Sequence, residues 1–175
     1  MPASQALDRG DRLFAKLEEQ KEEQQNYIGN LTCILRENKV LNRENQIDIR
    51  AFKQHLKEFQ WPSQWFTNKY EELAESCHEI ATSLPAYFEQ QQNIQGDFGT
   101  VNLAQVHTFT QCVQEGRQRL CMDQDTKNKV ESNFGPIQSI LQQTGLTEQQ
   151  LFPLVRQMLR GEQVDYQLWI PASYQ

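Results

Sequence analysis

The sequence predicts an all-α protein, a compact bundle of about six or seven helices with a docked, extended C-terminal tail. Apolar residues recur at steps of three and four along most of the chain, which is the helical period. The 8 glycines and 6 prolines among the 175 residues separate these segments, and no series of strands is evident. The length suits one domain, so we expect residues 1–175 to form a single helical domain.

A long first helix is expected over residues 8–37. Its apolar positions gather towards the two ends, near Phe14 and again near Ile28. Residues 18–26 between them are all polar, so this middle part can be helical by propensity but has nothing to bury. Two interpretations stay open for this exposed stretch: a solvated piece of helix, or an arm that contacts a partner.

The second helix is expected over residues 46–59 and is ended by Pro62, because proline cannot continue a helix interior. Ser63 can then cap the third helix, which Pro85 stops. This third helix has the clearest pattern, a single apolar stripe on one face. Its members are Phe66, Tyr70, Leu73, Cys77, Ile80 and Leu84.

The region after Pro85 predicts a short helix over residues 86–92 and a loop around two glycines over residues 95–100. Two longer helices follow, over about 101–120 and about 124–143. The Gly135-Pro136 pair lies inside the second of them, which predicts a kink or a split there.

The last predicted helix begins with a capping box, in which Thr147 caps and Gln150 reaches back. Gly161 ends it. The tail that follows, residues 162–175, holds Tyr166, Leu168, Trp169 and Ile170. We expect it docked in extended form, because these side chains are too apolar to remain in water.

The charge balance excludes some classes of partner. Acidic residues outnumber basic residues by 23 to 17, for a net charge of −6, and no basic run is present. A nucleic-acid-binding protein needs clustered Lys and Arg to neutralise phosphates, so nucleic acid is not expected as a partner. No stretch approaches the 18 apolar residues of a transmembrane helix, and the N-terminus lacks the apolar core of a signal peptide.

The sequence patterns that would indicate catalysis or metal binding are each incomplete. Residues 97–99 spell Asp-Phe-Gly, but the other parts of a protein kinase are absent. Residues 123–134 begin like a calcium loop, yet its sixth and twelfth positions hold Asn128 and Phe134. The three histidines and four cysteines show no zinc-ligand spacing, and no nucleophile elbow or phosphate-binding loop is present. We therefore expect a non-enzymatic protein without a metal or cofactor.

The four cysteines, Cys33, Cys77, Cys112 and Cys121, form an even set that permits two disulfides. Cys112 and Cys121 are nine residues apart, about 13 Å along a straight helix, so they cannot pair unless the helix ends between them. If two disulfides form, Cys33 with Cys121 and Cys77 with Cys112 is as plausible as the reverse, Cys33 with Cys112 and Cys77 with Cys121. A Cys33–Cys77 bond that joins the first and third helices also stays open. The alternative is that the cysteines are small buried apolar residues.

Asn30 begins an Asn-Leu-Thr sequon, which is an acceptor pattern for N-glycosylation. Together with the even cysteine set it favours an extracellular protein over a cytoplasmic one.

A set of aromatic residues on helix faces or ends has two interpretations, an ordinary core or the wall of an apolar ligand pocket between helices. Its members are Trp61, Trp65, Phe66, Tyr70, Phe88, Phe109 and Phe134.

The eight residues between Cys112 and Cys121 make the chain similar in class to the insect odorant-binding proteins, which are small secreted helical proteins with disulfides. The closely spaced second and third cysteines of that family are missing, since 43 residues separate Cys33 from Cys77. The resemblance therefore implies a helical, secreted class but transfers no binding residue.

The sequence thus favours a non-enzymatic, secreted helical binding protein. It would engage an apolar small molecule or lipid between helices, or a protein partner on its surface. The alternative is an intracellular helical scaffold that oligomerises through its long first helix.

Overall fold

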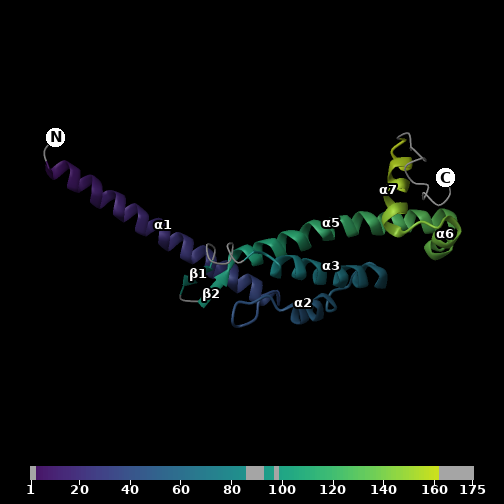
Figure 1. The fold of residues 1–175 in the computed structure, drawn as a ribbon, viewed down its shortest axis with the longest axis horizontal. Coiled ribbons are helices and arrows are strands. Elements are labelled where there is room, and N and C mark those ends of the chain that lie inside the picture. Colours follow the sequence, from purple (N-terminus) through teal and green to yellow (C-terminus); the bar gives the residue numbers. More distant parts are fainter. Residues whose placement is uncertain (1–2, 86–92, 97–98, 162–175) are drawn as a thin grey trace. The chain divides into compact units, whose positions relative to one another are not determined.

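The computed structural model describes the backbone of residues 3–85, 93–96 and 99–161, and the side chains of residues 14–85 and 99–161. Within these residues the protein is all-α apart from one short hairpin, which confirms the predicted fold class (Figure 1). The elements are α1 (Ala3–Glu37), α2 (Ile49–Leu56), α3 (Gln64–Thr82), β1 (Asn93–Gly96), β2 (Gly99–Asn102), α5 (Leu103–Phe134), α6 (Ile137–Thr144) and α7 (Glu148–Leu159). The helix expected over 86–92 and the tail over 162–175 lie outside the described residues.

Helix ends follow the capping residues of the sequence. The Ser63 hydroxyl accepts a hydrogen bond from the Phe66 N–H at 3.1 Å and opens α3. The Gln150 side chain accepts from the Thr147 N–H at 3.0 Å and opens α7. The second helix is shorter than predicted, because Asp48 caps it two residues after the expected start. These local bonds satisfy N–H groups that have no partner inside the helix.

The largest difference from the predicted helices is in α5. The predicted break between residues 120 and 124 was wrong, since α5 runs unbroken from Leu103 to Phe134. No glycine or proline lies between residues 120 and 124, so nothing there interrupts the backbone hydrogen bonds of the helix. The predicted split at Gly135-Pro136 is confirmed, because α5 ends just before it and α6 begins at Ile137.

Residues 95–96 and 99–100, which were expected in a loop, belong instead to two antiparallel strands. Asn93 pairs with Asn102 and Gly96 with Gly99. Gly99 has a φ of +88°, and a Cβ there would lie 3.3 Å from the Asn45 side chain. The strands were missed because each has four residues and a single apolar one, Ile94 or Val101, which is too short a pattern to mark a strand.

The contacts divide the chain into two compact units, residues 1–113 and 114–175, and α5 runs through the boundary. The expectation of a single domain stays a prediction.

In the first unit, α2 packs on α3 (Figure 1). The Phe52 ring of α2 meets Phe109 of α5 edge to face at 5.4 Å. The buried face of α3 corrects the predicted stripe, because Ala74 and Ala81 are fully buried whereas Ile80 is 52% exposed. Small residues thus let α3 approach its neighbours closely.

In the second unit, an ion pair between Arg156 of α7 and Asp123 of α5 joins the two helices at 2.5 Å. Glu131 ties α5 to α6, since one of its oxygens accepts from the Ile137 N–H at 3.2 Å and the other pairs with Lys127 at 2.6 Å. The buried apolar side chains of this unit are Val130, Ile137, Leu151 and Phe152.

Candidate binding surfaces

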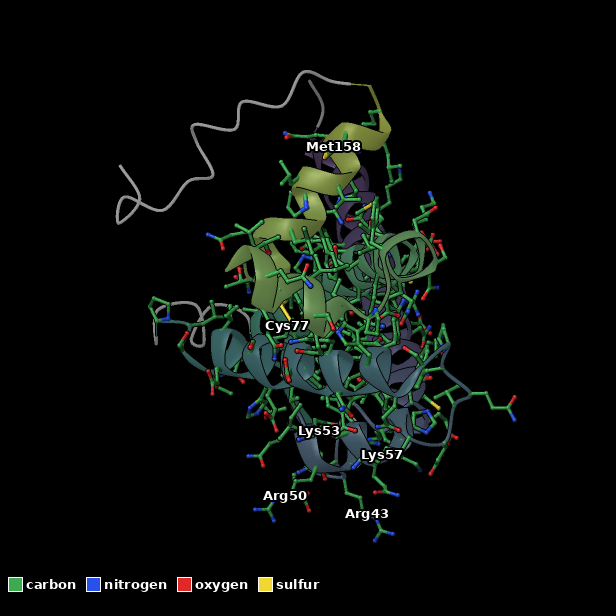
Figure 2. The ribbon with its side chains drawn as sticks, turned by 90° about the vertical axis from the view of Figure 1, so that its right-hand side faces the viewer. Arg43, Arg50, Lys53, Lys57, Cys77 and Met158 are labelled. Carbon is green, nitrogen blue, oxygen red and sulfur yellow. A yellow bond between two sulfur atoms is a disulfide. The ribbon has the colours of Figure 1, made fainter. Side chains whose placement is uncertain are left out.

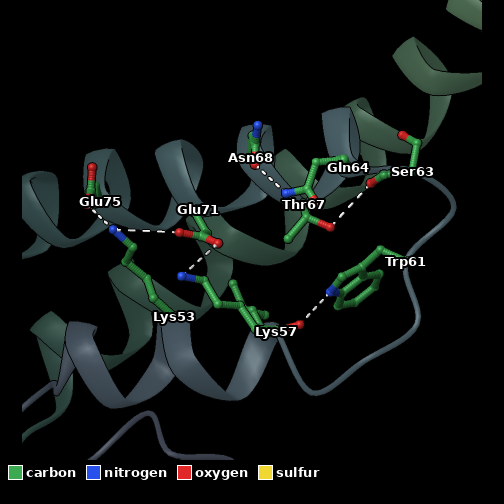
Figure 3. Close-up of polar contacts among 10 residues, drawn as sticks. Lys53, Lys57, Trp61, Ser63, Gln64, Thr67, Asn68, Glu71 and Glu75 are labelled. Atoms are coloured by element: carbon green, nitrogen blue, oxygen red, sulfur yellow. Dashed lines mark hydrogen bonds and ion pairs between the residues drawn. The ribbon is translucent and has the colours of Figure 1, made fainter.

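The predicted aromatic set lies largely in the packed interior. Phe66 and Tyr70 are buried, and the Trp61 ring contacts both at centroid distances of 5.5 and 5.3 Å. The Trp61 indole N–H donates to the Leu56 carbonyl, which joins α2 to the start of α3 (Figure 3). Phe109 is also buried, against Phe52.

The remaining members of that set do not form a wall together. Trp65 is half-buried, whereas Phe134 is 77% exposed at the end of α5 in the second unit. Phe88 lies outside the described residues.

A groove of about 660 Å³ opens in the first unit between the C-terminal half of α1 and the start of α5. Most of its lining residues are apolar, and the polar ones come from α1 and α5. None of the six described members of the aromatic set lines it. The lining consists of Gln24, Tyr27, Ile28, Leu31, Leu35, Leu84, Leu103, Ala104, Val106, His107, Thr108 and Thr110.

A continuous face of α1 connects this groove to the exposed arm. Residues at alternating steps of three and four define it, and we call it the α1 seam: Phe14, Leu17, Lys21, Gln24, Ile28, Leu31 and Leu35. Such spacing marks the packing face of a coiled-coil helix. With about 100° per residue, Phe14 and Leu17 point within about 40° of the direction of Ile28.

The two ends of the α1 seam differ sharply in burial. Ile28 and Leu35 are each 8% exposed, whereas Phe14 is 68% exposed and Leu17 is 51% exposed. No other element of the same unit lies beside the N-terminal half of α1 in Figure 1. The face that packs at one end of the helix is therefore open to solvent at the other.

The sequence pattern indicated Phe14 and the polar stretch 18–26, but it did not predict the seam. Lys21 and Gln24 occupy two of its positions, so the apolar pattern is interrupted. Counting heptads across the polar stretch would have found it, because a seam tolerates single polar positions.

Two of the four cysteines are joined. Cys77 of α3 and Cys112 of α5 form a disulfide with their Cα atoms 5.7 Å apart. Cys33 and Cys121 are exposed and carry free thiols, so the second disulfide is not formed and the Cys33–Cys77 pairing is excluded.

The predicted glycan acceptor lies on α1. Asn30 is exposed, whereas Thr32 of the same sequon is buried and its hydroxyl donates to the Ile28 carbonyl at 2.7 Å. Asn30 lies about 160° around the helix axis from Ile28 of the seam, so a glycan on Asn30 would project from the other side of α1. Glycosylation itself stays a prediction.

Basic side chains gather along α2 and the turn before it, where Arg43 and Arg50 reach away from the ribbon (Figure 2). Lys53 is bonded to Glu75, and Lys57 lies 3.6 Å from Glu71 (Figure 3). The hydrogen bond to Glu75 raises the pKa of Lys53 above its ordinary value, and the nearby carboxylate charges add to this. Two of these four basic side chains, Lys53 and Lys57, therefore pair with carboxylates of α3 where α2 packs on it.

A second, smaller hollow of about 330 Å³ lies in the second unit between α5 and α7. Arg156 lines it but is already paired with Asp123. The other lining residues mix apolar, basic and acidic side chains: Met122, Asp125, Thr126, Lys129, Leu159 and Arg160.

Across the described residues, no group of three or more His, Cys, Asp or Glu side chains is arranged to hold a metal ion. Within the same part of the chain, no helix combines the length and the apolar character needed to cross a membrane. The chain matches no known family, no characterised protein and no solved structure.

Proposed function

We propose that this chain is a non-enzymatic, extracellular binding protein that recognises a helix of a protein partner along the α1 seam. The observation that carries the proposal is the exposure of Phe14 and Leu17 on the same face of α1 that is buried at Ile28. An amphipathic helix laid on this face would follow the common helix-in-groove mode of peptide recognition.

Phe14 and Leu17 alone do not supply enough apolar surface for a stable complex. Burying a fully exposed Phe or Leu side chain is worth about 1.5–3 kcal/mol. Because Phe14 is 68% exposed and Leu17 is 51% exposed, together they supply about 2–4 kcal/mol. Association itself costs on the order of 4–15 kcal/mol. The partner must therefore bring its own apolar face and extend towards the groove, where the seam continues through Gln24 and Ile28.

The test uses a labelled 28-residue peptide probe, an amphipathic helix with Leu at every core heptad position. Fluorescence anisotropy should show saturable binding to the wild-type protein. The double substitution Phe14→Glu and Leu17→Glu should weaken binding at least tenfold, because it puts two charges into the apolar contact.

The matched control adds the same two charges to the opposite face of α1, with Ala15→Glu and Asn26→Glu. Both residues are exposed, so the helix should persist in circular dichroism. Equal loss of binding in the two double variants would contradict the proposal, as would no binding by the wild type at a concentration at which it is monomeric.

The groove supports a second candidate function, the binding of an apolar small molecule or lipid. Its volume of about 660 Å³ falls in the usual range of ligand pockets. A fluorescent fatty acid should bind the wild type, and Ala104→Trp should block it by filling the groove. Ala15→Trp on exposed α1 is the control, and binding that survives Ala104→Trp would remove this candidate.

The Cys77–Cys112 disulfide supports the extracellular compartment in this proposal, because such bonds persist in oxidising surroundings. The alternative, an intracellular scaffold that assembles through α1, uses the same seam. It differs in the expected state of these two cysteines, which would be reduced in the cytosol.

A further inference from the structure

We infer that the partner helix on the α1 seam is α1 of a second copy of this chain, running antiparallel. This inference rests on the proposed function, since it names the occupant of the same face. Three features of α1 support it: its length, the distribution of its charges, and Lys21 at a central seam position.

The length of the exposed arm suits an antiparallel pair. If Phe14 of one copy lies opposite Leu17 of the other, positions whose numbers add to 31 face each other. Ala3, the first helical residue, then lies opposite Ile28, the first buried seam residue. Residues 3–28 of α1 in each copy would therefore pair along their whole length, and the first turns of each α1 would lie beside the groove of the other copy, whose lining includes Gln24 and Ile28.

The charges of α1 disfavour the parallel arrangement. Residues 18–23 hold four glutamates and one lysine. A parallel, in-register pair would set two such stretches side by side, with helix axes about 8–10 Å apart. That separation is about one Debye length at physiological salt, so the repulsion would be felt.

The antiparallel arrangement removes this repulsion. It shifts the two acidic stretches about 15 Å apart along the axis, at about 1.5 Å per residue. Each then faces residues 8–13 of the other copy, in which two Asp and two Arg balance.

Lys21 gives a second, independent reason. In a parallel pair, Lys21 would face its own copy across the seam and bury two like charges. In the antiparallel pair it faces Gly10, which has no side chain to compete for the space. A polar residue at one core position is a common way to fix the register of a coiled coil.

The exposed thiol of Cys33 allows a direct test of orientation. We would label Cys33 with a nitroxide in a Cys121→Ser variant, without breaking the Cys77–Cys112 disulfide. Pulsed dipolar spectroscopy should give an inter-label distance of roughly 50 Å for the antiparallel pair, at about 1.5 Å per residue. Parallel pairing would give a distance below roughly 25 Å, the separation of neighbouring helices plus two label arms.

Sedimentation equilibrium of the same protein should show a monomer–dimer equilibrium. Phe14→Glu with Leu17→Glu should raise the dimer dissociation constant at least tenfold, and the control pair Ala15→Glu with Asn26→Glu should change it less than threefold. A short distance between labels, a dimer insensitive to the seam variant, or a monomer at every concentration would each overturn the inference.

The outcomes also separate this inference from the proposed function. A monomer that still binds the amphipathic peptide through Phe14 and Leu17 would retain the function and exclude the second copy as partner. A monomer that does not bind the peptide would remove both.

Discussion

Cys77 is fully buried in α3, and its only covalent partner outside its own backbone is Cys112. The sequence located Cys77 in an apolar stripe and excluded a bond between Cys112 and Cys121 along one helix. That exclusion depends on α5 continuing past residue 120, which it does. The pairing itself stayed open, because it depends on which helices are neighbours and no local pattern encodes that.

Removal of this disulfide should lower the free energy of unfolding substantially. The double substitution Cys77→Ala and Cys112→Ala opens a loop with a sequence separation of 35 residues. The expected loss is about 2–5 kcal/mol, mainly because the unfolded chain gains freedom. Urea unfolding measures it, with Cys33→Ser and Cys121→Ser as the control pair. Both control sites are exposed, so we expect a change within about 0.5 kcal/mol; equal losses in the two pairs would refute the assignment.

At the scale of elements, helix ends were predicted better than helix faces. Ser63 and the Thr147–Gln150 pair act through bonds to their own neighbours, so sequence alone reveals them. The face of α3 was harder, since Ala74 is fully buried although alanine is a weak apolar signal. The groove could not be predicted, because its walls come from α1 and α5, which are far apart in the sequence.

The joint between α5 and α6 should make stability depend on pH. The hydrogen bond from Lys127 is the main cause that lowers the pKa of Glu131 below its ordinary value of 4.5, and the Ile137 N–H adds to it. A carboxyl whose pKa is lower in the folded state stabilises the fold fully above its unfolded pKa. That stabilisation is lost as the pH falls through the folded value.

The substitution Glu131→Gln should therefore reduce stability at pH 7 by on the order of 1 kcal/mol or less, because the group is partly exposed. The difference from wild type should shrink towards zero below the ordinary pKa of 4.5. Thermal unfolding between pH 3 and pH 7 would measure it, as a scan over about the range in which carboxyl groups titrate. Asp125→Asn, at an exposed site on the same helix, is the control. A difference that persists unchanged at low pH would contradict this role.

For the whole molecule, the sequence predicted the helical class correctly because its period recurs over most of the chain. It did not predict that contacts divide the chain at Val113 and Gln114, inside one continuous helix. No proline or loop marks this boundary, and the nearby Gly116 does not interrupt α5. Such a boundary follows from tertiary contacts alone.

The oxidation state of the whole chain can be measured directly. Intact-mass spectrometry of the protein purified without reductant should show a loss of two hydrogen atoms relative to the reduced chain. Iodoacetamide should then modify two thiols, those of Cys33 and Cys121. Four modified thiols would exclude the disulfide and favour the intracellular alternative, whereas none would indicate a second bond.

The position of the Cys77–Cys112 bond also determines how the chain would respond to tension. A pulling force applied to the two ends would pass from α3 to α5 through the sulfur atoms, and residues 78–111 would carry no load. Reduction of the bond would allow these residues to extend as well, which adds about 120 Å to the length of the stretched chain at 3.3–3.6 Å per residue. The bond lies immediately before the boundary between the two units. Tension would therefore act on the second unit, while residues 78–111 would bear none until the bond is reduced.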